Sequence, residues 1–235
     1  TVNIHSDNNT GLGDLSMGQV TATSVAGRAT FTNVILSDAA VNNNYTLDFT
    51  APLTAGSTTS VASATFQVIH GAAHHIAISR QASGATAGNI FATQPIVQVQ
   101  DIENHVVTDG NLSGSSIQVS VSTGGTLVGT TTIVAVNGIA RFTDLGLSGL
   151  KATYTLTFEG LNTGFSTVTQ SLALGYGNAD RLVVTTEPVG GHATGAAFTT
   201  APVVKVYDAY GNVVENSTAT ITATVASGDG NATLH

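Results

Sequence analysis

The sequence repeats itself with a period of about 107 residues, and this repeat constrains the fold more than any local pattern. The segment 95–101 (PIVQVQD) recurs at 202–208 (PVVKVYD), and 73–79 (AHHIAIS) recurs at 179–185 (ADRLVVT). Two further pairs follow the same rule, 27–32 with 138–143 and 45–49 with 154–158. A fixed period of this length indicates a tandem array of copied modules.

The repeat divides the chain into three parts. Residues 1–70 correspond to a module that lacks its first strands, 71–176 to a complete module, and 177–235 to the N-terminal half of a third. We therefore expect residues 1–235 to be a segment of a longer repetitive polypeptide. The incomplete modules could be completed by other parts of the same polypeptide, which we expect, or by strand exchange with a neighbouring copy.

The composition excludes several classes of protein. Only 9% of residues are charged, against about 25% in ordinary soluble domains, and the net charge is −8. The few Lys and Arg residues are scattered, which argues against nucleic-acid binding. Cysteine is absent, and no apolar run is long enough for a membrane helix. A surface of Ser, Thr, Asn and Gln is typical of secreted repeat proteins, so we expect an extracellular, cell-surface or secreted location.

Apolar and polar residues alternate with a period of two along most of the chain. Tyr154, Leu156 and Phe158, for example, alternate with threonines, as in a half-buried strand. No stretch has helical spacing, so we expect essentially no helix. The all-β pattern predicts tandem immunoglobulin-like antiparallel β-sandwich modules. In the complete module the expected strands lie near 75–80, 94–101, 116–122, 131–136, 139–144, 152–159 and 166–174.

The connections between modules are short. Residues 70–74 and 175–179 are all that separates the last strand of one module from the first strand of the next. Short joints restrict reorientation more than long flexible linkers do, so the array should be a semi-rigid rod.

Tyr154, like Tyr45, is either a tyrosine corner or an ordinary core aromatic residue.

Several segments resemble the V-x-V-x-D-x-x-G-N-x-V signature of bacterial immunoglobulin-like tandem repeats, which occur in invasin- and intimin-like surface and adhesin proteins. The segments that carry the resemblance are 97–107, 204–214, 125–132, 137–145 and 154–158. The resemblance covers essentially the whole chain. It is specific for the fold and says little about the function. The second copy departs from the signature, with Asn104-His105 where the third copy has Gly211-Asn212.

Acidic residues cluster after the strands that end at 101 and 208. Asp101, Glu103 and Asp109, and likewise Asp208 and Glu215, could supply oxygen ligands to calcium. Alternatively, Asp101 and Asp208 open the turn after a core strand, with side chains that accept backbone hydrogen bonds. We expect the turn, because too few carboxylates converge for calcium. Asp180 lies at a joint with only Asn178 as an oxygen-bearing neighbour.

Histidines are densest at the first joint. Adjacent strand residues point to opposite faces, so we expect that His74 and His75 do not share a metal, and that His70, His74 and His75 form a polar joint. No catalytic motif is recognisable. We therefore predict no catalytic, cofactor-binding or metal-ligating residues and no enzyme activity.

Glycosylation sequons are about as frequent as chance predicts from the Asn, Ser and Thr content, so they do not indicate glycosylation. They begin at Asn8, Asn44, Asn111, Asn216 and Asn231.

The pattern as a whole predicts a non-catalytic structural or adhesive repeat segment of a long extracellular surface or filament-forming protein. The expected partners are neighbouring repeats of the same chain, other copies in a fibre or bundle, or a host-surface or extracellular polymer ligand. The alternative is an accessory, carbohydrate-binding module of a secreted polysaccharide-degrading enzyme, which would need an exposed aromatic platform. The chain has no Trp, and only Tyr176, Tyr207 and Tyr210 fall outside the core alternation.

Overall fold

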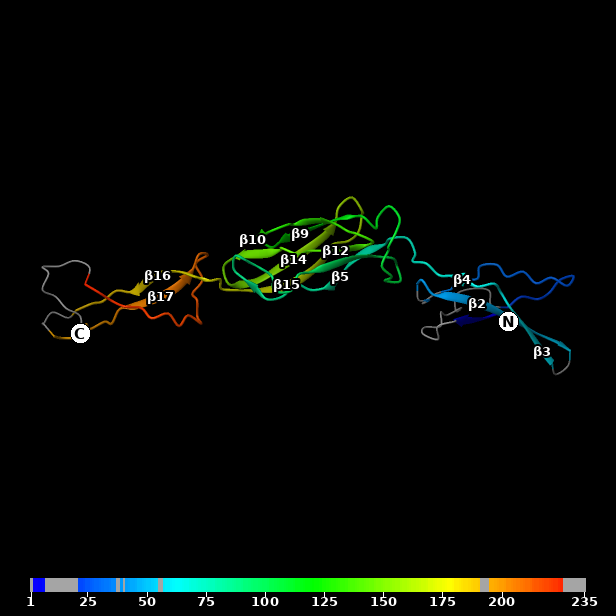
Figure 1. The fold of residues 1–235 in the computed structure, drawn as a ribbon, viewed down its shortest axis with the longest axis horizontal. Coiled ribbons are helices and arrows are strands. Elements are labelled where there is room, and N and C mark those ends of the chain that lie inside the picture. Colours follow the sequence, from blue (N-terminus) through cyan, green and yellow to red (C-terminus); the bar gives the residue numbers. More distant parts are fainter. Residues whose placement is uncertain are drawn as a thin grey trace.

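The computed structural model describes residues 2–6, 21–36, 39, 41–54, 57–190 and 195–225. Within these ranges the chain is all-β, with no helix, and its strands form several small sheets. Three groups of strands follow one another along the long axis of an elongated molecule (Figure 1). None of the described residues belongs to a helix that could cross a membrane.

The N-terminal group is one antiparallel sheet. Its strands are β1 (Val2–Ser6), β2 (Asn44–Thr54), β3 (Ser57–Ala62) and β4 (Phe66–Gln67). The long strand β2 lies in the middle and pairs with β1 along one edge. Along its other edge it pairs with β3 and, farther along, with β4. The C-terminal group is the antiparallel pair β16 (Ala179–Thr186) and β17 (Val203–Asp208).

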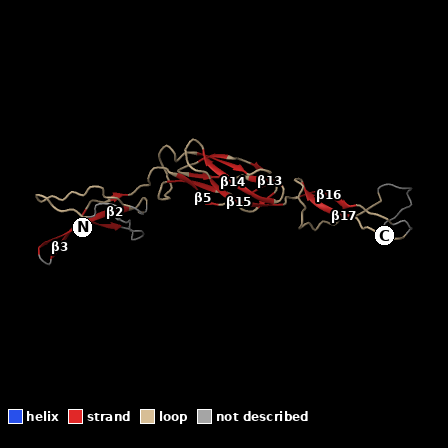
Figure 2. Ribbon diagram, turned by 180° about the vertical axis from the view of Figure 1, so that it is seen from behind, coloured by secondary structure: helices blue, strands red, loops and turns tan. Residues whose placement is uncertain are grey.

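The central group contains three sheets, shown as the densest cluster of strands in Figure 2. The five-stranded sheet has the order β11 (Thr132–Val134), β9 (Ser116–Val121), β14 (Ala152–Gly160), β15 (Val168–Gly175) and β6 (Ala85–Thr86). A three-stranded sheet has the order β12 (Ile139–Arg141), β8 (Ile96–Gln100) and β5 (His75–Arg80). A second has the order β10 (Gly125–Val128), β13 (Gly146–Gly149) and β7 (Asn89–Ile90). All pairings are antiparallel except that of β6 with β15.

One hydrophobic core joins the three central sheets. Its fully buried side chains include Val97 and Val99 on β8, Leu156 and Phe158 on β14, and Leu147 on β13. The alternation of apolar and polar residues places these side chains on the inward faces of the strands. The core therefore draws on each sheet, as the period of two in the sequence predicts.

Two glutamines complete the hydrogen bonding of this core. The amide of Gln170 on β15 accepts from the backbone N–H of Ala82 at 2.9 Å and donates to the carbonyl of the same residue. Gln94 bonds both backbone groups of Leu145 in the same way, at 3.0 and 2.9 Å. The Gln170 side chain takes the place of a strand neighbour for Ala82, because a buried backbone group without a partner is costly. The Leu145 carbonyl accepts from the backbone N–H of Phe91 as well as from Gln94.

Tyr154 has the hydrogen bond of a tyrosine corner. Its hydroxyl lies 2.8 Å from the carbonyl oxygen of Leu150, four residues earlier, and 3.3 Å from that of Gly124. The ring is buried, so this residue is both a core aromatic and a fixed corner of the loop before β14. Tyr154 thus has both the hydrogen bond expected of a corner and the burial expected of a core aromatic residue.

Each of the seven strands expected for residues 71–176 corresponds to a strand of the structure. The sequence missed the sheet formed by β7, β10 and β13. These strands are short, and β10 and β13 contain Gly125, Gly146 and Gly149, which add no apolar side chain to the alternation. The side chains of the flanking groups are more exposed to solvent than those of the central group. Every residue of β3 is exposed, as is every residue of β16 except the last.

Candidate functional site

The candidate site is the pair of connections between the groups of strands. The first joint comprises residues 68–74, between β4 and β5, and the second joint comprises residues 176–178, between β15 and β16. The first joint begins two residues earlier than the sequence indicated, because β4 ends at Gln67. At both joints the repeat places an aspartate directly at or after the second strand of the following group.

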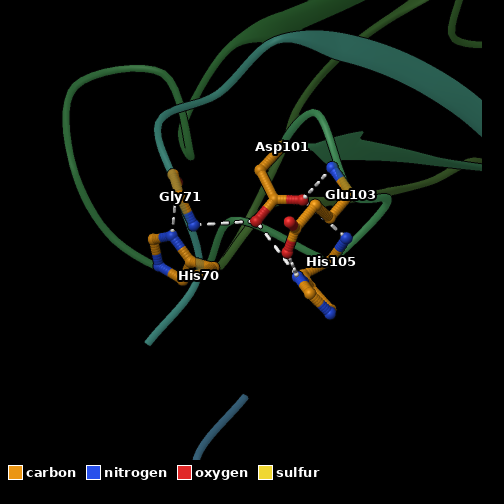
Figure 3. Close-up of polar contacts among 5 residues, drawn as sticks. All are labelled: His70, Gly71, Asp101, Glu103 and His105. Carbon is orange, nitrogen blue, oxygen red and sulfur yellow. Dashed lines mark hydrogen bonds and ion pairs between the residues drawn. The ribbon is translucent and has the colours of Figure 1, made fainter. Parts of the chain in front are cut away.

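At the first joint the carboxylate of Asp101 accepts hydrogen bonds from two directions (Figure 3). Its Oδ2 accepts from the backbone N–H of Gly71 in the joint at 2.7 Å. Its Oδ1 accepts from the N–H groups of Glu103 and His105 in the turn after β8, at 3.0 and 2.8 Å. The side chain is 2% exposed, so these bonds are shielded from water. Asp101 thus ties the joint to the strand that it caps.

At the second joint Asp208 makes the same arrangement. Its Oδ2 accepts from the backbone N–H of Gly177 at 2.7 Å. Its Oδ1 accepts from the N–H groups of Tyr210 and Asn212 in the turn after β17, at 2.9 and 2.8 Å. Asp208 is fully buried. The two joints therefore use one recurring contact, which we call the Asp–Gly clasp: Asp101 with Gly71, and Asp208 with Gly177.

The clasps hold both aspartates in the charged form. Burial alone raises the pKa of Asp101, but the hydrogen bonds from Gly71 and His105 outweigh it and lower the pKa below its usual value. Burial also raises the pKa of Asp208, and the bonds from Gly177, Asn212 and Tyr210 again lower it overall. Charged acceptors make stronger hydrogen bonds than neutral ones, so ionisation strengthens each clasp.

The turn interpretation of Asp101 and Asp208 is confirmed, and the departure from the repeat signature does not change the turn. Asn104 has a φ of 69° where Gly211 has 92°, and both donate a backbone hydrogen bond to the carbonyl of the clasp aspartate. Asparagine tolerates this left-handed conformation better than most residues. His105 then takes the place of Asn212, with its Nδ1 3.2 Å from Asp101 Oδ2.

The second joint has further bonds across it. Asn212 is buried, accepts a 2.6 Å hydrogen bond from the backbone N–H of Lys151, and donates to the carbonyl of Gly149 at 3.1 Å. The ammonium of Lys151 lies 2.7 Å from the carboxylate of Glu215. This ion pair is exposed and contributes little, whereas the bonds of Asn212 are protected. The described residues show no counterpart of the Asn212 bonds at the first joint.

Two tyrosines outside the core alternation also make contacts at the second joint. The Tyr210 ring lies against Gly88, where a Cβ atom would overlap it. Lys151 Nζ lies 5.7 Å from the centre of the Tyr176 ring. Tyr176 also lines a groove of about 470 Å³ with Val214 and residues 216–219, whereas Tyr207 is half-buried on β17.

The histidines of the first joint are arranged differently from the expectation. The prediction that His74 and His75 point to opposite faces is wrong: their Nδ1 atoms are 3.4 Å apart and their rings meet edge to face. The reason is that β5 begins at His75, so His74 lies outside the strand and does not follow its alternation. His70 is separate, with its Nδ1 2.8 Å from the Gly71 carbonyl and its Nε2 3.2 Å from Asp109 Oδ1.

The other acidic candidates do not converge. Glu103 comes only within 4.0 Å of the His105 ring, and Asp180 pairs with Arg181 beside it at 3.4 Å. Among the described residues, no group of three or more His, Asp or Glu side chains could hold a metal ion. Of the sequon asparagines, Asn44, Asn111 and Asn216 are exposed. Asn8 and Asn231 lie outside the described residues.

Sequence reasoning missed Gly71 and Gly177 as partners of the aspartates. The signal was present, because each glycine lies a few residues before the first strand of its repeat and the aspartate ends the second strand. Gly177 lacks room for a side chain, and at Gly71 a side chain would be tightly placed. A Cβ atom at Gly177 would overlap the carbonyl of Ala87, and one at Gly71 would touch the Asp101 carboxylate.

No family model matches the sequence, and no curated protein matches it. Among solved structures, the crystal structure of a beta-glycosidase from Bacteroides vulgatus is similar to 73% of this chain, with a TM-score of 0.37 and 12% sequence identity. The chain spans about a fifth of that protein, because the similar region covers 21% of it. A similarity at this level assigns neither a fold nor an activity.

Proposed function

We propose that this chain is a non-catalytic repeat segment of a long extracellular surface or filament-forming protein, in which immunoglobulin-like β-sandwich modules form a semi-rigid rod. The observation that carries the proposal is the Asp–Gly clasp, which is present at both joints with the same 2.7 Å bond. A contact that holds each module to the connection before it restricts bending. A spacer that presents adhesive parts at a distance needs this property.

The sandwich assignment is supported by the central group of strands. Its sheets share one core, its strands follow the expected positions, and Tyr154 forms the corner found in many such domains. The polar, weakly charged surface supports an extracellular setting. In this proposal the rod contributes no chemistry of its own, and adhesion depends on its surface or on parts that it carries.

Small-angle X-ray scattering tests the proposal. Asp101→Asn with Asp208→Asn keeps the size of the side chains but replaces one carboxylate oxygen by an NH2 group, which donates hydrogen bonds and cannot accept one from a backbone N–H. Hydrogen bonds to charged groups contribute about 1.5–3 kcal/mol each, so we expect the double variant to bend and its maximum dimension to fall. Asp180→Asn, an exposed change next to the same joint, should leave the scattering unchanged. Equal curves for all three proteins would contradict the rod.

A further inference from the structure

Two adjacent histidines converge where the first joint meets the central group. His75 is the first residue of β5, and His74 precedes it. The backbone N–H of His74 donates a 2.8 Å hydrogen bond to the carbonyl of Gln100, so β8 holds this residue although it lies outside the strand. The two Nδ1 atoms are 3.4 Å apart, and the ring planes meet at 79° with their centres 5.6 Å apart. Two imidazole nitrogens therefore face one another from an anchored stretch of backbone.

The same two positions also bring their side chains together in the next repeat. There Asp180 and Arg181 take the places of His74 and His75. Arg181 Nη1 lies 3.4 Å from Asp180 Oδ2. The fold thus places these neighbouring side chains in contact in both copies, although the residues differ. The contact of the two histidines is therefore a property of the repeat.

Both positions are open to solvent. His74 is exposed and His75 is half-buried. At the second joint the preceding group is the three-sheet central group, and the side chains of Asp180 and Arg181 are still 51% and 47% exposed. The openness at His74 and His75 is therefore not caused by the smaller group of strands that precedes the first joint.

The other histidines near the first joint already have partners (Figure 3). His70 Nδ1 lies 2.8 Å from the carbonyl oxygen of Gly71, and His105 Nδ1 lies 3.2 Å from Asp101 Oδ2. In the described part of the chain, neither ring of the His74–His75 pair forms an ion pair with a carboxylate. The pair is thus the only place near this joint where two imidazoles meet without an acidic partner.

The contact between the two Nδ1 atoms needs a proton or a cation. A neutral imidazole has one N–H donor and one acceptor nitrogen, so one Nδ1 must carry a proton that the other accepts. If both rings carry their proton on Nε2 instead, both Nδ1 lone pairs are available to a metal ion. A metal ion can therefore replace the shared proton.

The separation of the two nitrogens fits a tetrahedral metal ion. Zn²⁺ binds imidazole nitrogen at about 2.0–2.1 Å in tetrahedral geometry, which places two ligand nitrogens about 3.3–3.4 Å apart. Neighbouring ligands of a square-planar ion at the same bond length are only about 2.8 Å apart. The observed separation of 3.4 Å matches the tetrahedral value. The geometry therefore favours Zn²⁺ over square-planar Cu²⁺ or Ni²⁺.

We propose that His74 and His75 form an open Zn²⁺-binding site in which Nδ1 of each ring is a ligand. Two protein ligands leave two positions of the tetrahedron for water or for a donor group of another molecule. A shared metal ion contradicts the sequence-based expectation for these residues, which assumed that their side chains point to opposite faces. The site goes beyond the proposed rod and does not depend on it.

Isothermal titration calorimetry with ZnCl₂ on the 235-residue chain, prepared without a polyhistidine tag, tests the site. We expect one Zn²⁺ to bind per chain at the histidine pair. His74→Asp with His75→Arg copies the pair of the next repeat, so this variant should melt like the unsubstituted chain. Loss of an outer-shell partner alone costs about 10–100-fold in metal affinity, so loss of both ligands should weaken binding at least tenfold.

Two further variants complete the comparison. His74→Asn removes one exposed ligand and should also weaken Zn²⁺ binding at least tenfold, which tests the site by a milder change. His105→Asn is the matched control, because it copies Asn212 of the next repeat and changes a histidine outside the pair. The control variant should bind Zn²⁺ as tightly as the unsubstituted chain.

Nitrogen-15 NMR of the imidazole rings identifies the ligand atoms. Zn²⁺ should shift the Nδ1 resonances of two rings, and these resonances should be missing from the His74→Asp, His75→Arg variant. Excess Ca²⁺, which prefers oxygen ligands, should cause no such shift. Coordination through Nε2, equal Zn²⁺ affinity in the double variant, or loss of binding in His105→Asn would overturn the proposal. These measurements do not depend on the stiffness of the joints, so failure of the zinc site is distinguishable from failure of the rod.

Discussion

The backbone N–H of Gly177 donates a 2.7 Å hydrogen bond to Asp208 Oδ2, and this bond holds the second joint, which follows β15, to the strand pair after it. The same bond links Gly71 to Asp101 at the first joint. Two joints a full repeat apart thus share one contact. The contact uses an aspartate that is shielded from water and a glycine, which at position 177 has no room for a side chain.

A methyl group at Gly177 should open the second joint. Gly177→Ala drives a Cβ atom into the carbonyl of Ala87, and overlaps of this kind cost about 1–3 kcal/mol. We expect the hydrogen-exchange protection of the joint amides to fall roughly tenfold or more. Gly71→Ala is the matched change, and its effect should be smaller because only the Asp101 side chain must move. Unchanged exchange in the Gly177 variant would count against the clasp.

The clasps should weaken in acid. The pKa values of Asp101 and Asp208 are lowered in the folded chain, relative to about 3.9 in an unfolded one. Their contribution to stability is therefore complete above about pH 4 and is lost as the pH falls through the lowered folded values. Scattering from pH 6 to pH 2 should show the chain becoming more flexible below pH 4. In the double Asp→Asn variant this transition should be absent.

Strand positions followed from the sequence because burial on one face imposes a period of two. The strand β14 is predicted in this way by the alternating apolar residues Tyr154, Leu156 and Phe158. The sheet of β7, β10 and β13 could not be found in the same way, because its strands are short and two of them contain glycines. Local alternation carries no information about such pairings, which depend on the strands around them.

The sequence predicts the turns of the candidate site but not the hydrogen bonds to the two glycines. The turn role of Asp101 and Asp208 follows from their place at the end of a strand, since aspartate side chains bond the backbone of the turns they open. Their bonds to Gly71 and Gly177 span about thirty residues, and only the packing of the joint brings those groups together. The contact of His74 with His75 was mispredicted because strand alternation was applied to His74, which precedes β5 and does not follow it.

Removing the hydroxyl of Tyr154 should destabilise the central group modestly. Tyr154→Phe loses the 2.8 Å bond to Leu150 but keeps the buried ring, and one such bond contributes about 0.5–1.5 kcal/mol. Denaturant unfolding measures the change. Tyr176→Phe is the control, because that ring is only half-buried. An effect no larger than that of the control would argue against the corner.

Loss of the Gln170 amide should destabilise the central group more than loss of the Tyr154 hydroxyl. Gln170→Met keeps the length of the side chain but leaves both backbone groups of Ala82 without their partner. Each buried group without a hydrogen bond costs about 1–3 kcal/mol, so for two groups we expect a loss of about 2–6 kcal/mol in the free energy of unfolding. Gln118→Met changes an exposed residue on β9 and should cost little. Similar losses in the two variants would mean that the Gln170 amide is not needed.

The most direct test of the rod measures the spread of distances across the second joint. Spin labels on Ser171→Cys and Thr185→Cys, both exposed, flank this joint, and dilution with unlabelled protein isolates distances within one chain. Double electron–electron resonance should give a narrow distribution, which Asp208→Asn broadens and Asp180→Asn leaves unchanged. A broad distribution in the unsubstituted chain, or a narrow one that survives Asp208→Asn, would contradict the claim that the Asp–Gly clasp stiffens the rod.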